Sequence, residues 1–370
     1  MRFINLPYEE FLKIRRDRNI ILFGASSAWK YYLSTFPDIS SEVLDNTLFA
    51  VDNNPEKQGK QLEVNSRRIP IENVEKLKKE DNYIILITVS LVYQKSICEQ
   101  LLSLGLDENT ECYSLPLMTY NFAETDNNCV KEYFDKHTVM VNTPKIHSFW
   151  FSVEEKPDLY KRCIDSWYRH CPDFEIIEWT AKNYDVTKNR YMKEAFEHKK
   201  WAFVSDYARL DVIYQYGGIY MDMDVELLAP ISLLLNADSF FCRQDDGYLE
   251  LGSGFGAKAG DSLVGDMLET YKNRKLILED GKVDMTAQPE WLSEVLKKHG
   301  IDKCYDSQII GNCLILSNDY ITCYTDKNSI QNAKMGVHWH NGAWLDDRDR
   351  EIIKDSHDVK DELVEKYFHL

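Results

Sequence analysis

The first third of the chain alternates between continuous apolar runs and amphipathic segments. The apolar runs predict buried strands at residues 19–26 (NIILFGAS), 46–51 (NTLFAV), 82–90 (NYIILITVS) and 110–115 (TECYSL). The amphipathic segments between them, such as LVYQKSICEQLLSLG at 91–105, predict helices. Continuous apolar strands separated by helices are typical of an α/β fold with a small parallel sheet that is covered on both faces.

The pattern fades after this region and then starts again. Strands are predicted at 144–152 (PKIHSFWFS), 175–179 (EIIEW) and 219–224 (IYMDMD), with helices at 156–174 and 202–218. We therefore expect three regions: a parallel-sheet accessory domain at 1–115, a linker at 116–142, and a second α/β domain at 143–370.

The charge balance excludes one class of partner. The chain has 44 basic and 61 acidic residues and a formal net charge of −17, whereas a nucleic-acid-binding protein needs basic surface. Anionic small molecules are not excluded, because a bound metal ion can supply positive charge. The 370 residues include nine cysteines without a C-x-x-C pair, which is typical of free thiols in a reducing compartment.

The N-terminal segment predicts a cytoplasmic protein. MRFINLPYEEFLKIRRDRNI has charges in every turn and no apolar signal-peptide core, and no run approaches the roughly 20 apolar residues of a membrane span. We expect no transmembrane segment and at most peripheral contact with the inner face of the membrane.

The stretch GGIYMDMDV, residues 217–225, contains the first candidate for chemistry. Strand alternation predicts that Asp222 and Asp224 lie on one side of the strand end. Two close carboxylates repel each other unless a cation or a proton lies between them, and hard divalent ions such as Mn²⁺ or Mg²⁺ bind carboxylate oxygens. On its own, however, an Asp-x-Asp pair is more typical of a solvated turn.

The preceding helix adds a second pair. Asp206 and Arg209 are three residues apart, so they share a helix face, and Arg209 can orient the Asp206 carboxylate. Gly217 and Gly218 end the helix and turn the chain into the strand, which brings this face near the strand outlet.

The joint pattern S-D-x-x-R, G-G-x-Y and D-x-D, in SDYARLDVIYQYGGIYMDMDVELLAP, resembles glycosyltransferase family 32, the group with the DXD sugar-binding motif. The resemblance extends over residues 143–346, including GSGFGAKAGDSL and GVHWHNGAWL. It implies a GT-A fold, a nucleotide-sugar donor, a divalent metal and retention of anomeric configuration. In the first region, FAVDNNPEKQG resembles Rossmann-like modules attached to sugar-polymer biosynthesis proteins.

The resemblance also implies roles for individual residues. Asp206 and Arg209 would contact the donor sugar and ribose, Asp222 would hold the ribose and metal-bound water, and Asp224 would bind the metal. Trp150 would stack on the nucleobase, although an aromatic residue within FWF is also typical of a core. Tyr220 is placed in the donor-binding set.

A late cluster completes the predicted site. His338 and His340 share one strand face, and His338 is the expected third metal ligand, although packed or surface histidines explain the pattern equally well. Trp344 would close over the sugar. The serine of the family pattern is replaced here by Ala343, which has no hydroxyl group to make the lid contact of the serine.

The resemblance implies transfer of a hexose from a nucleotide sugar, with a UDP-sugar as the expected donor. The expected acceptor is a saccharide, such as a lipid-linked one, in capsule or exopolysaccharide synthesis. Front-face attack is favoured over a covalent intermediate because no carboxylate is nominated as nucleophile. Three acidic residues of the loop RQDDGYLELG could line the acceptor side, and the sequence does not rank them: Asp245, Asp246 and Glu250.

The sequence leaves three alternatives open. A haloacid-dehalogenase-like phosphotransferase would use Asp222 as nucleophile, but it favours Thr or Val where this chain has Glu226. A non-enzymatic nucleotide-sugar-binding protein would use the same pocket without turnover. In the first region, Gly24 and Asp52 lie where a dinucleotide-binding fold holds its cofactor, although only one glycine of G-x-G-x-x-G is present.

Overall fold

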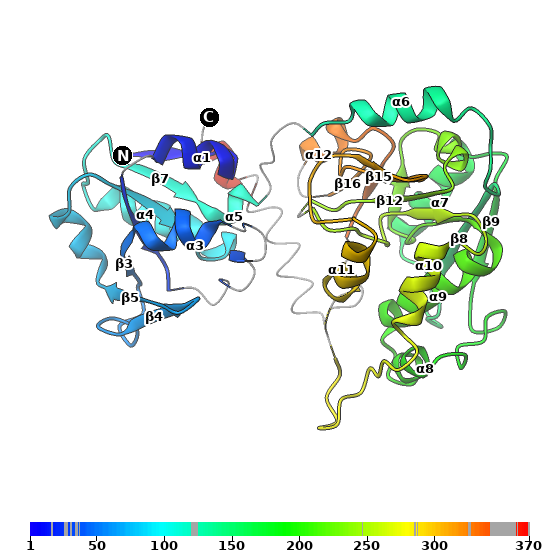
Figure 1. Cartoon of the computed structure of the whole chain (residues 1–370). Coiled ribbons are helices and arrows are strands. Elements are labelled where there is room, and N and C mark those ends of the chain that lie inside the picture. Colours follow the sequence, from blue (N-terminus) through cyan, green and yellow to red (C-terminus); the bar gives the residue numbers. More distant parts are fainter. Residues whose placement is uncertain are drawn as a thin grey trace. The chain divides into compact units, whose positions relative to one another are not determined.

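The computed structural model divides the chain into two compact units, Met1–Glu124 with Glu351–Leu370, and Thr125–Arg350 (Figure 1). The structure describes every residue except a set of short segments and positions. These are 16, 17, 26–28, 30, 31, 34, 35, 37, 120–124, 246, 285, 287, 325, 326, 341–359, 361, 369 and 370, together with the side chains of 290, 293 and 327–329.

The first unit is built on a seven-stranded sheet in the order β1-β7-β6-β2-β3-β5-β4. All neighbouring strands are parallel except the antiparallel β4–β5 pair. The parallel sheet predicted from the apolar runs is confirmed by β2, β3, β6 and β7. The strands are β1 (Arg2–Ile4), β2 (Asn19–Phe23), β3 (Thr47–Val51), β4 (Gln61–Val64), β5 (Arg67–Glu72), β6 (Tyr83–Ile87) and β7 (Glu111–Ser114).

Apolar side chains fill both faces of this sheet, because the central strands carry runs of apolar residues, Ile20–Phe23 in β2 and Ile84–Ile87 in β6, whose side chains alternate between the two faces. The helical segments that accompany them are α1 (Tyr8–Arg15), α3 (Ile39–Glu42), η1 (Leu44–Asn46), η2 (Val74–Lys79), η3 (Leu91–Tyr93), α4 (Gln94–Ser103) and α5 (Leu115–Met118).

The domain limits in the structure differ from the expected ones. The predicted linker contains α5, which belongs to the first unit, and α6 (Asn128–Lys136), which belongs to the second. The end of the chain also returns to the first unit, because the buried Leu363 and Phe368 join the core that contains Phe3. The rings of Phe3 and Phe368 meet edge to face at 5.3 Å.

The second unit has a seven-stranded mixed sheet in the order β14-β15-β12-β13-β10-β8-β9. The three strands at one side, β9, β8 and β10, are parallel, and β13 runs antiparallel to β10. The strands are β8 (Lys145–Phe149), β9 (Glu175–Trp179), β10 (Gly218–Tyr220), β12 (Ser239–Cys242), β13 (Phe255–Ala257), β14 (Gln308–Ile310) and β15 (Cys313–Leu316).

Helices cover both faces of this sheet and enclose two apolar cores. Helices α8, α9 and α10 lie close together beside the sheet (Figure 1). Besides α6, the helical segments of this unit are α7 (Asp158–His170), α8 (Arg190–Glu197), α9 (Trp201–Tyr216), η4 (Ser232–Asn236), α10 (Ser262–Glu269), α11 (Gln288–Lys298) and α12 (Lys327–Asn332).

The two glycines after α9 are required by the backbone. Gly217 and Gly218 have φ angles of 66° and 99°, which L side chains rarely adopt. A Cβ on Gly218 would also lie 2.9 Å from the carbonyl oxygen of Lys145 on the neighbouring strand. Only glycine therefore allows the chain to leave the helix and enter β10 so closely beside β8.

A second, three-stranded sheet has the order β11-β17-β16. Its strands are β11 (Val225–Leu227), β16 (Ile321–Cys323) and β17 (Gly336–His338). The antiparallel β11–β17 pairing places His338 opposite Val225, directly after Asp224. This pairing joins the end of the second unit to the Asp-x-Asp segment.

None of the helices in the described part of the chain combines the length and the apolar character that a membrane span requires.

Candidate active site

The Asp-x-Asp segment is a turn, which corrects the prediction that the strand continues to Asp224, although both carboxylates face His338. Strand β10 ends at Tyr220, and the amide of Val225 donates to the carbonyl of Asp222 at 3.1 Å, as in a β-turn. The amide of Asp222 donates to Gly252 at 2.9 Å, and the carbonyl of Asp224 accepts from Trp339 at 3.0 Å. The loop before β13 and the residue after β17 therefore hold the turn.

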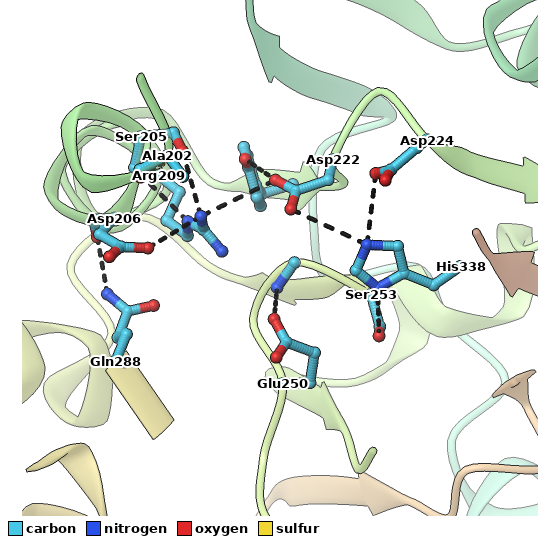
Figure 2. A network of polar contacts seen from close by, with 12 residues as sticks. Ala202, Ser205, Asp206, Arg209, Asp222, Asp224, Glu250, Ser253, Gln288 and His338 are labelled. Carbon is cyan, nitrogen blue, oxygen red and sulfur yellow. Dashed lines mark hydrogen bonds and ion pairs between the residues drawn. The ribbon is translucent and has the colours of Figure 1, made fainter. Parts of the chain in front are cut away.

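His338 lies beside both carboxylates. Its Nε2 is 3.3 Å from Oδ1 of Asp224 and 4.0 Å from Oδ2 of Asp222. Figure 2 shows the three side chains turned toward one another, and one ligand atom from each lies within 4.8 Å of the others. On the other side of the ring, Nδ1 is 2.9 Å from Oγ of Ser253, which fixes the ring orientation.

The second histidine of the late cluster is not part of this group. The His340 ring packs on His338 at 4.0 Å, and its Nε2 lies 3.2 Å from Sγ of Cys323.

Arg209 links the two acidic segments. Its Nη2 is 2.9 Å from Oδ1 of Asp206 and 3.8 Å from Oδ1 of Asp222. The same nitrogen donates to Oγ of Ser205 at 3.1 Å, and the guanidinium lies 4.9 Å from the centre of the Tyr220 ring. Asp206 and Arg209 therefore form the ion pair that their spacing on the helix predicts.

Tyr220 lies beneath the site. Its side chain is buried, and its hydroxyl donates to Oδ1 of Asp222. This position orients Asp222 through a hydrogen bond, whereas the sequence placed Tyr220 among the residues that touch the donor.

Asp206 is held from the backbone side by a residue that the sequence did not indicate. Gln288 of α11 donates from Nε2 to the carbonyl oxygen of Asp206 at 2.8 Å. Burial raises the pKa of the Asp206 carboxyl to about 7, although Arg209 lowers it. Asp222 and Glu250 add to the rise because like charges disfavour ionisation.

Glu250 is the fourth carboxylate of the site. Its Oε1 accepts from the amide of Gly252 at 2.7 Å, and Figure 2 shows it near His338 and Asp222. Burial raises the pKa of Glu250, while His338 and Arg209 lower it. Of the other two acidic residues of this loop, Asp245 is described by the structure and Asp246 lies outside the described residues.

The electrostatics of the site favour a cation. Four carboxylates lie near the Arg209 guanidinium and the His338 imidazole, and Arg274 adds a smaller effect that lowers the pKa of Asp206; the carboxylates are those of Asp206, Asp222, Asp224 and Glu250. Burial lowers the pKa of His338, but Asp224 and Asp222 raise it more, so the net shift is upward. Carboxylate oxygens and an imidazole nitrogen are ligands for divalent ions, and the spacing of Asp222, Asp224 and His338 fits such an ion.

Of the two tryptophans predicted for the donor site, the structure describes only Trp150. Trp150 follows β8, is only partly buried, and donates from Nε1 to the carbonyl of Glu154 at 3.0 Å. Nζ of Lys156 lies 5.7 Å from its ring centre, and Tyr160 packs against it edge to face. Trp344 lies outside the described residues.

In the first unit, Asp52 has partners within the chain. Its two carboxylate oxygens accept hydrogen bonds from the amides of Ala25 and Asn54 at 2.8 and 2.9 Å, and Lys57 Nζ is 3.0 Å away. Gly24 has a φ of 107°, and a Cβ there would lie 2.1 Å from Val89. Loop packing therefore accounts for both residues without a cofactor.

Residues 157–241 match the family model described as "Glycosyltransferase sugar-binding region containing DXD motif". This range includes Asp206, Arg209, Asp222 and Asp224, and it ends before Glu250 and His338. The chain is 30% identical over 106 residues to inositol phosphoceramide mannosyltransferase 1 of Schizosaccharomyces pombe, which covers 26% of this chain and 32% of the relative. The matched part therefore spans about a third of that relative's length.

The matching solved structures include the following two. PaToxG glycosyltransferase is 14% identical, with a TM-score of 0.32, over 46% of this chain and 74% of that chain. Aspartate semialdehyde dehydrogenase II of Vibrio cholerae is 10% identical, with a TM-score of 0.21, over 95% of this chain and 99% of that chain. Neither score is high enough to establish a shared fold. The family match and the mannosyltransferase relative support a glycosyltransferase, because residues 157–241 of the second unit are similar to the sugar-binding region with the DXD motif.

Proposed function

We propose that the chain is a metal-dependent, retaining glycosyltransferase that moves a hexose from a nucleotide sugar to a saccharide acceptor. The observation that carries this proposal is the cluster of Asp222, Asp224 and His338, whose ligand atoms lie within 4.8 Å of one another. Two of these residues belong to the matched DXD region, and the third comes from a distant strand.

Asp222, Asp224 and His338 would hold the cation. When bound, a divalent ion supplies positive charge that stabilises a diphosphate leaving group. Mn²⁺ suits this set better than Mg²⁺, because the imidazole nitrogen is a ligand that transition metals accept more readily. Ser253 would keep the His338 ring in its ligating orientation by accepting from Nδ1, as outer hydrogen-bond partners of metal-bound histidines do.

The other residues of the cluster would bind the donor. Arg209 places a fixed positive charge between Asp206 and Asp222, and it costs no reorganisation when negative charge develops on the leaving group. Asp206 would accept hydrogen bonds from sugar hydroxyl groups. Trp150 would offer an indole face to the nucleobase, and Trp344 would close over the sugar.

The finer assignments belong to the same proposal. The mixed sheet of the second unit would be of the GT-A type, and the first unit would be a Rossmann-like accessory domain. The donor would be a UDP-hexose; the name of the fission-yeast relative adds a mannose donor to the candidates. The acceptor would be a lipid-linked saccharide of capsule or exopolysaccharide synthesis, handled in the cytoplasm at the inner face of the membrane.

Retention would proceed by front-face attack, in which the leaving phosphate accepts the proton of the acceptor hydroxyl. Two other functions use the same residues: phosphoryl transfer through Asp222, and binding of a nucleotide sugar without turnover. Oδ1 of Asp222 accepts from the buried Tyr220 hydroxyl and faces Arg209. This environment favours a fixed ligand over a nucleophile.

The first experiment measures release of free sugar from a panel of UDP-glucose, UDP-galactose, UDP-N-acetylglucosamine and GDP-mannose with Mn²⁺. We expect one donor to be hydrolysed only with metal, and Asp224→Ala to lower the rate at least 100-fold because a charged ligand is lost. Mn²⁺ affinity, followed by electron paramagnetic resonance, should fall in the same variant.

The outcomes separate the three functions. Phosphate release without sugar release would support the phosphotransferase, and metal-dependent donor binding without turnover, even with added saccharides, would support the binding protein. If no donor binds or reacts in the presence of Mn²⁺, the proposed function is wrong.

A further inference from the structure

Glu250 is held rigidly at the rim of the site. It lies in the loop between β12 and β13, and its amide donates to the carbonyl of Cys242 at 2.9 Å. In the same loop, the buried guanidinium of Arg243 donates to the carbonyls of Gly247 and Asp302 at 2.8 and 3.1 Å. Arg243 therefore fixes the backbone that carries Glu250.

The Glu250 side chain converges with Asp222 above Gly252. A Cβ on Gly252 would lie 2.5 Å from Oδ2 of Asp222 and 2.8 Å from Oε1 of Glu250. The two carboxylate oxygens thus approach the same point from different loops. The absence of a side chain at position 252 leaves this point open.

Glu250 is not one of the three clustered metal ligands. Its Oε1 accepts one hydrogen bond, from Gly252, and no group among the described residues donates to Oε2. An ionised carboxylate has about four acceptor positions, so most of its capacity remains for a ligand. Hydroxyl groups of a sugar are donors that match this capacity.

We propose that Glu250 is a specificity-determining residue that accepts hydrogen bonds from hydroxyl groups of the donor sugar and restricts the donor to an uncharged hexose. The inference rests on the proposed transferase function. A site built to bind a substrate hydroxyl discriminates strongly against analogues that lack it. A hexuronate, which carries a carboxylate, would instead be repelled by Glu250, Asp222 and Asp206.

The test compares Glu250→Gln with the wild-type chain on the donor hexose that the wild type turns over and on the hexuronate with the same nucleotide and ring configuration. Glutamine keeps the size of the side chain and removes its charge. Glu269→Gln, at a surface carboxylate of α10 that pairs with Lys272, is the matched control. Affinity for the free nucleoside diphosphate with Mn²⁺ is measured in parallel.

We expect kcat/KM for the hexose to fall at least tenfold in Glu250→Gln and the hexuronate-to-hexose ratio of kcat/KM to rise at least tenfold. Affinity for the nucleoside diphosphate with Mn²⁺ should stay within twofold, and Glu269→Gln should behave as wild type. The inference is overturned if Glu250→Gln keeps wild-type kcat/KM and ratio, or if it loses nucleoside diphosphate affinity to the same extent as hexose turnover.

The wild-type measurements distinguish this failure from a failure of the proposed function. A wild-type chain that turns over a hexose donor while Glu250→Gln is unchanged contradicts only the role of Glu250. A wild-type chain that binds no nucleotide sugar with Mn²⁺ contradicts both.

Discussion

At the scale of single residues, Gly252 shows how closely the loops of the site approach each other. Its φ lies outside the left-handed region, so alanine is compatible with the backbone, but the added methyl group would overlap Oδ2 of Asp222 at 2.5 Å. Asp222 has little freedom to move away, because Tyr220 and Arg209 hold its other oxygen.

We therefore expect Gly252→Ala to weaken Mn²⁺ binding at least tenfold while the thermal midpoint stays within a few degrees of wild type. Isothermal titration with Mn²⁺ and calorimetric unfolding measure the two quantities. Wild-type Mn²⁺ affinity in Gly252→Ala would show that Asp222 can shift without loss, or that it is not a ligand.

The sequence predicted some site residues and not others for a physical reason. Asp206, Arg209, Asp222 and Asp224 follow from local spacing on one helix and one turn. Glu250 was named only as one of three unranked loop carboxylates, and Ser253 and Gln288 were not indicated, because their approach to the site depends on tertiary packing. The glycine-rich run around Ser253 signals a close backbone approach, but it does not say to which residue.

At the scale of elements, the turn at Asp222–Val225 replaces the predicted continuation of the strand. The alternation of Ile219, Met221 and Met223 is real, and all three are buried. However, Met223 is buried after the chain has already turned toward β11. Periodicity therefore identified these three buried side chains, but it missed the burial of Tyr220 and Asp224 and the end of the strand, because a buried turn and a buried strand have the same apolar pattern.

His147 joins β8 to β9 and to the end of α9. Its Nδ1 accepts from Nε1 of Trp179 at 3.0 Å, and its Nε2 lies 3.0 Å from the carbonyl oxygen of Gly217. The carbonyl can only accept, so the proton is on Nε2 and the ring is neutral. Burial lowers the pKa of His147 to about 4, although the hydrogen bond to Gly217 opposes this.

This lowered pKa predicts a pH dependence of stability. Between about pH 6.5 and 4 the unfolded chain binds a proton that the folded chain does not, so acidification in this window favours unfolding by up to roughly 3 kcal/mol. Above pH 6.5 the histidine is neutral in both states, and the effect is absent.

His147→Gln provides the comparison, since glutamine can donate to Gly217 but does not titrate. We expect the variant to be less stable at pH 7 and its thermal midpoint to fall less steeply than that of the wild type between pH 6.5 and 4. Parallel curves for the two proteins over this range would mean that His147 does not cause the dependence.

At the scale of the whole molecule, the sequence predicted the alternating α/β order and parallel strands, but not the path of the last residues. Leu363, Tyr367 and Phe368 are apolar at helical spacing, and such a pattern fits the core of either unit. The pattern alone does not predict that this segment packs against Phe3. The β4–β5 hairpin was also not indicated, because its strands are short and mostly polar.

The return of the chain predicts that a change near the C-terminus destabilises the first unit. Phe368 is 1% exposed, and Phe→Ala in a core costs about 3–5 kcal/mol. We expect Phe368→Ala to lower the calorimetric transition of the first unit and leave Mn²⁺ affinity unchanged.

Phe174→Ala, a buried phenylalanine of the second unit, is the matched control and should lower the other transition. Loss of Mn²⁺ binding in Phe368→Ala at a temperature where the second unit stays folded would contradict the assignment of this segment to the first unit.

The pairing of β11 with β17 has a consequence for the order of folding. Asp222 and Asp224 become neighbours as soon as a short turn forms, but His338 arrives only when the chain has closed a long loop and added a late strand. Loop closure over such a distance is slow relative to local turns. The complete cation site would therefore form among the last events of folding, and Mn²⁺ capture after dilution from denaturant would time the completion of the second unit.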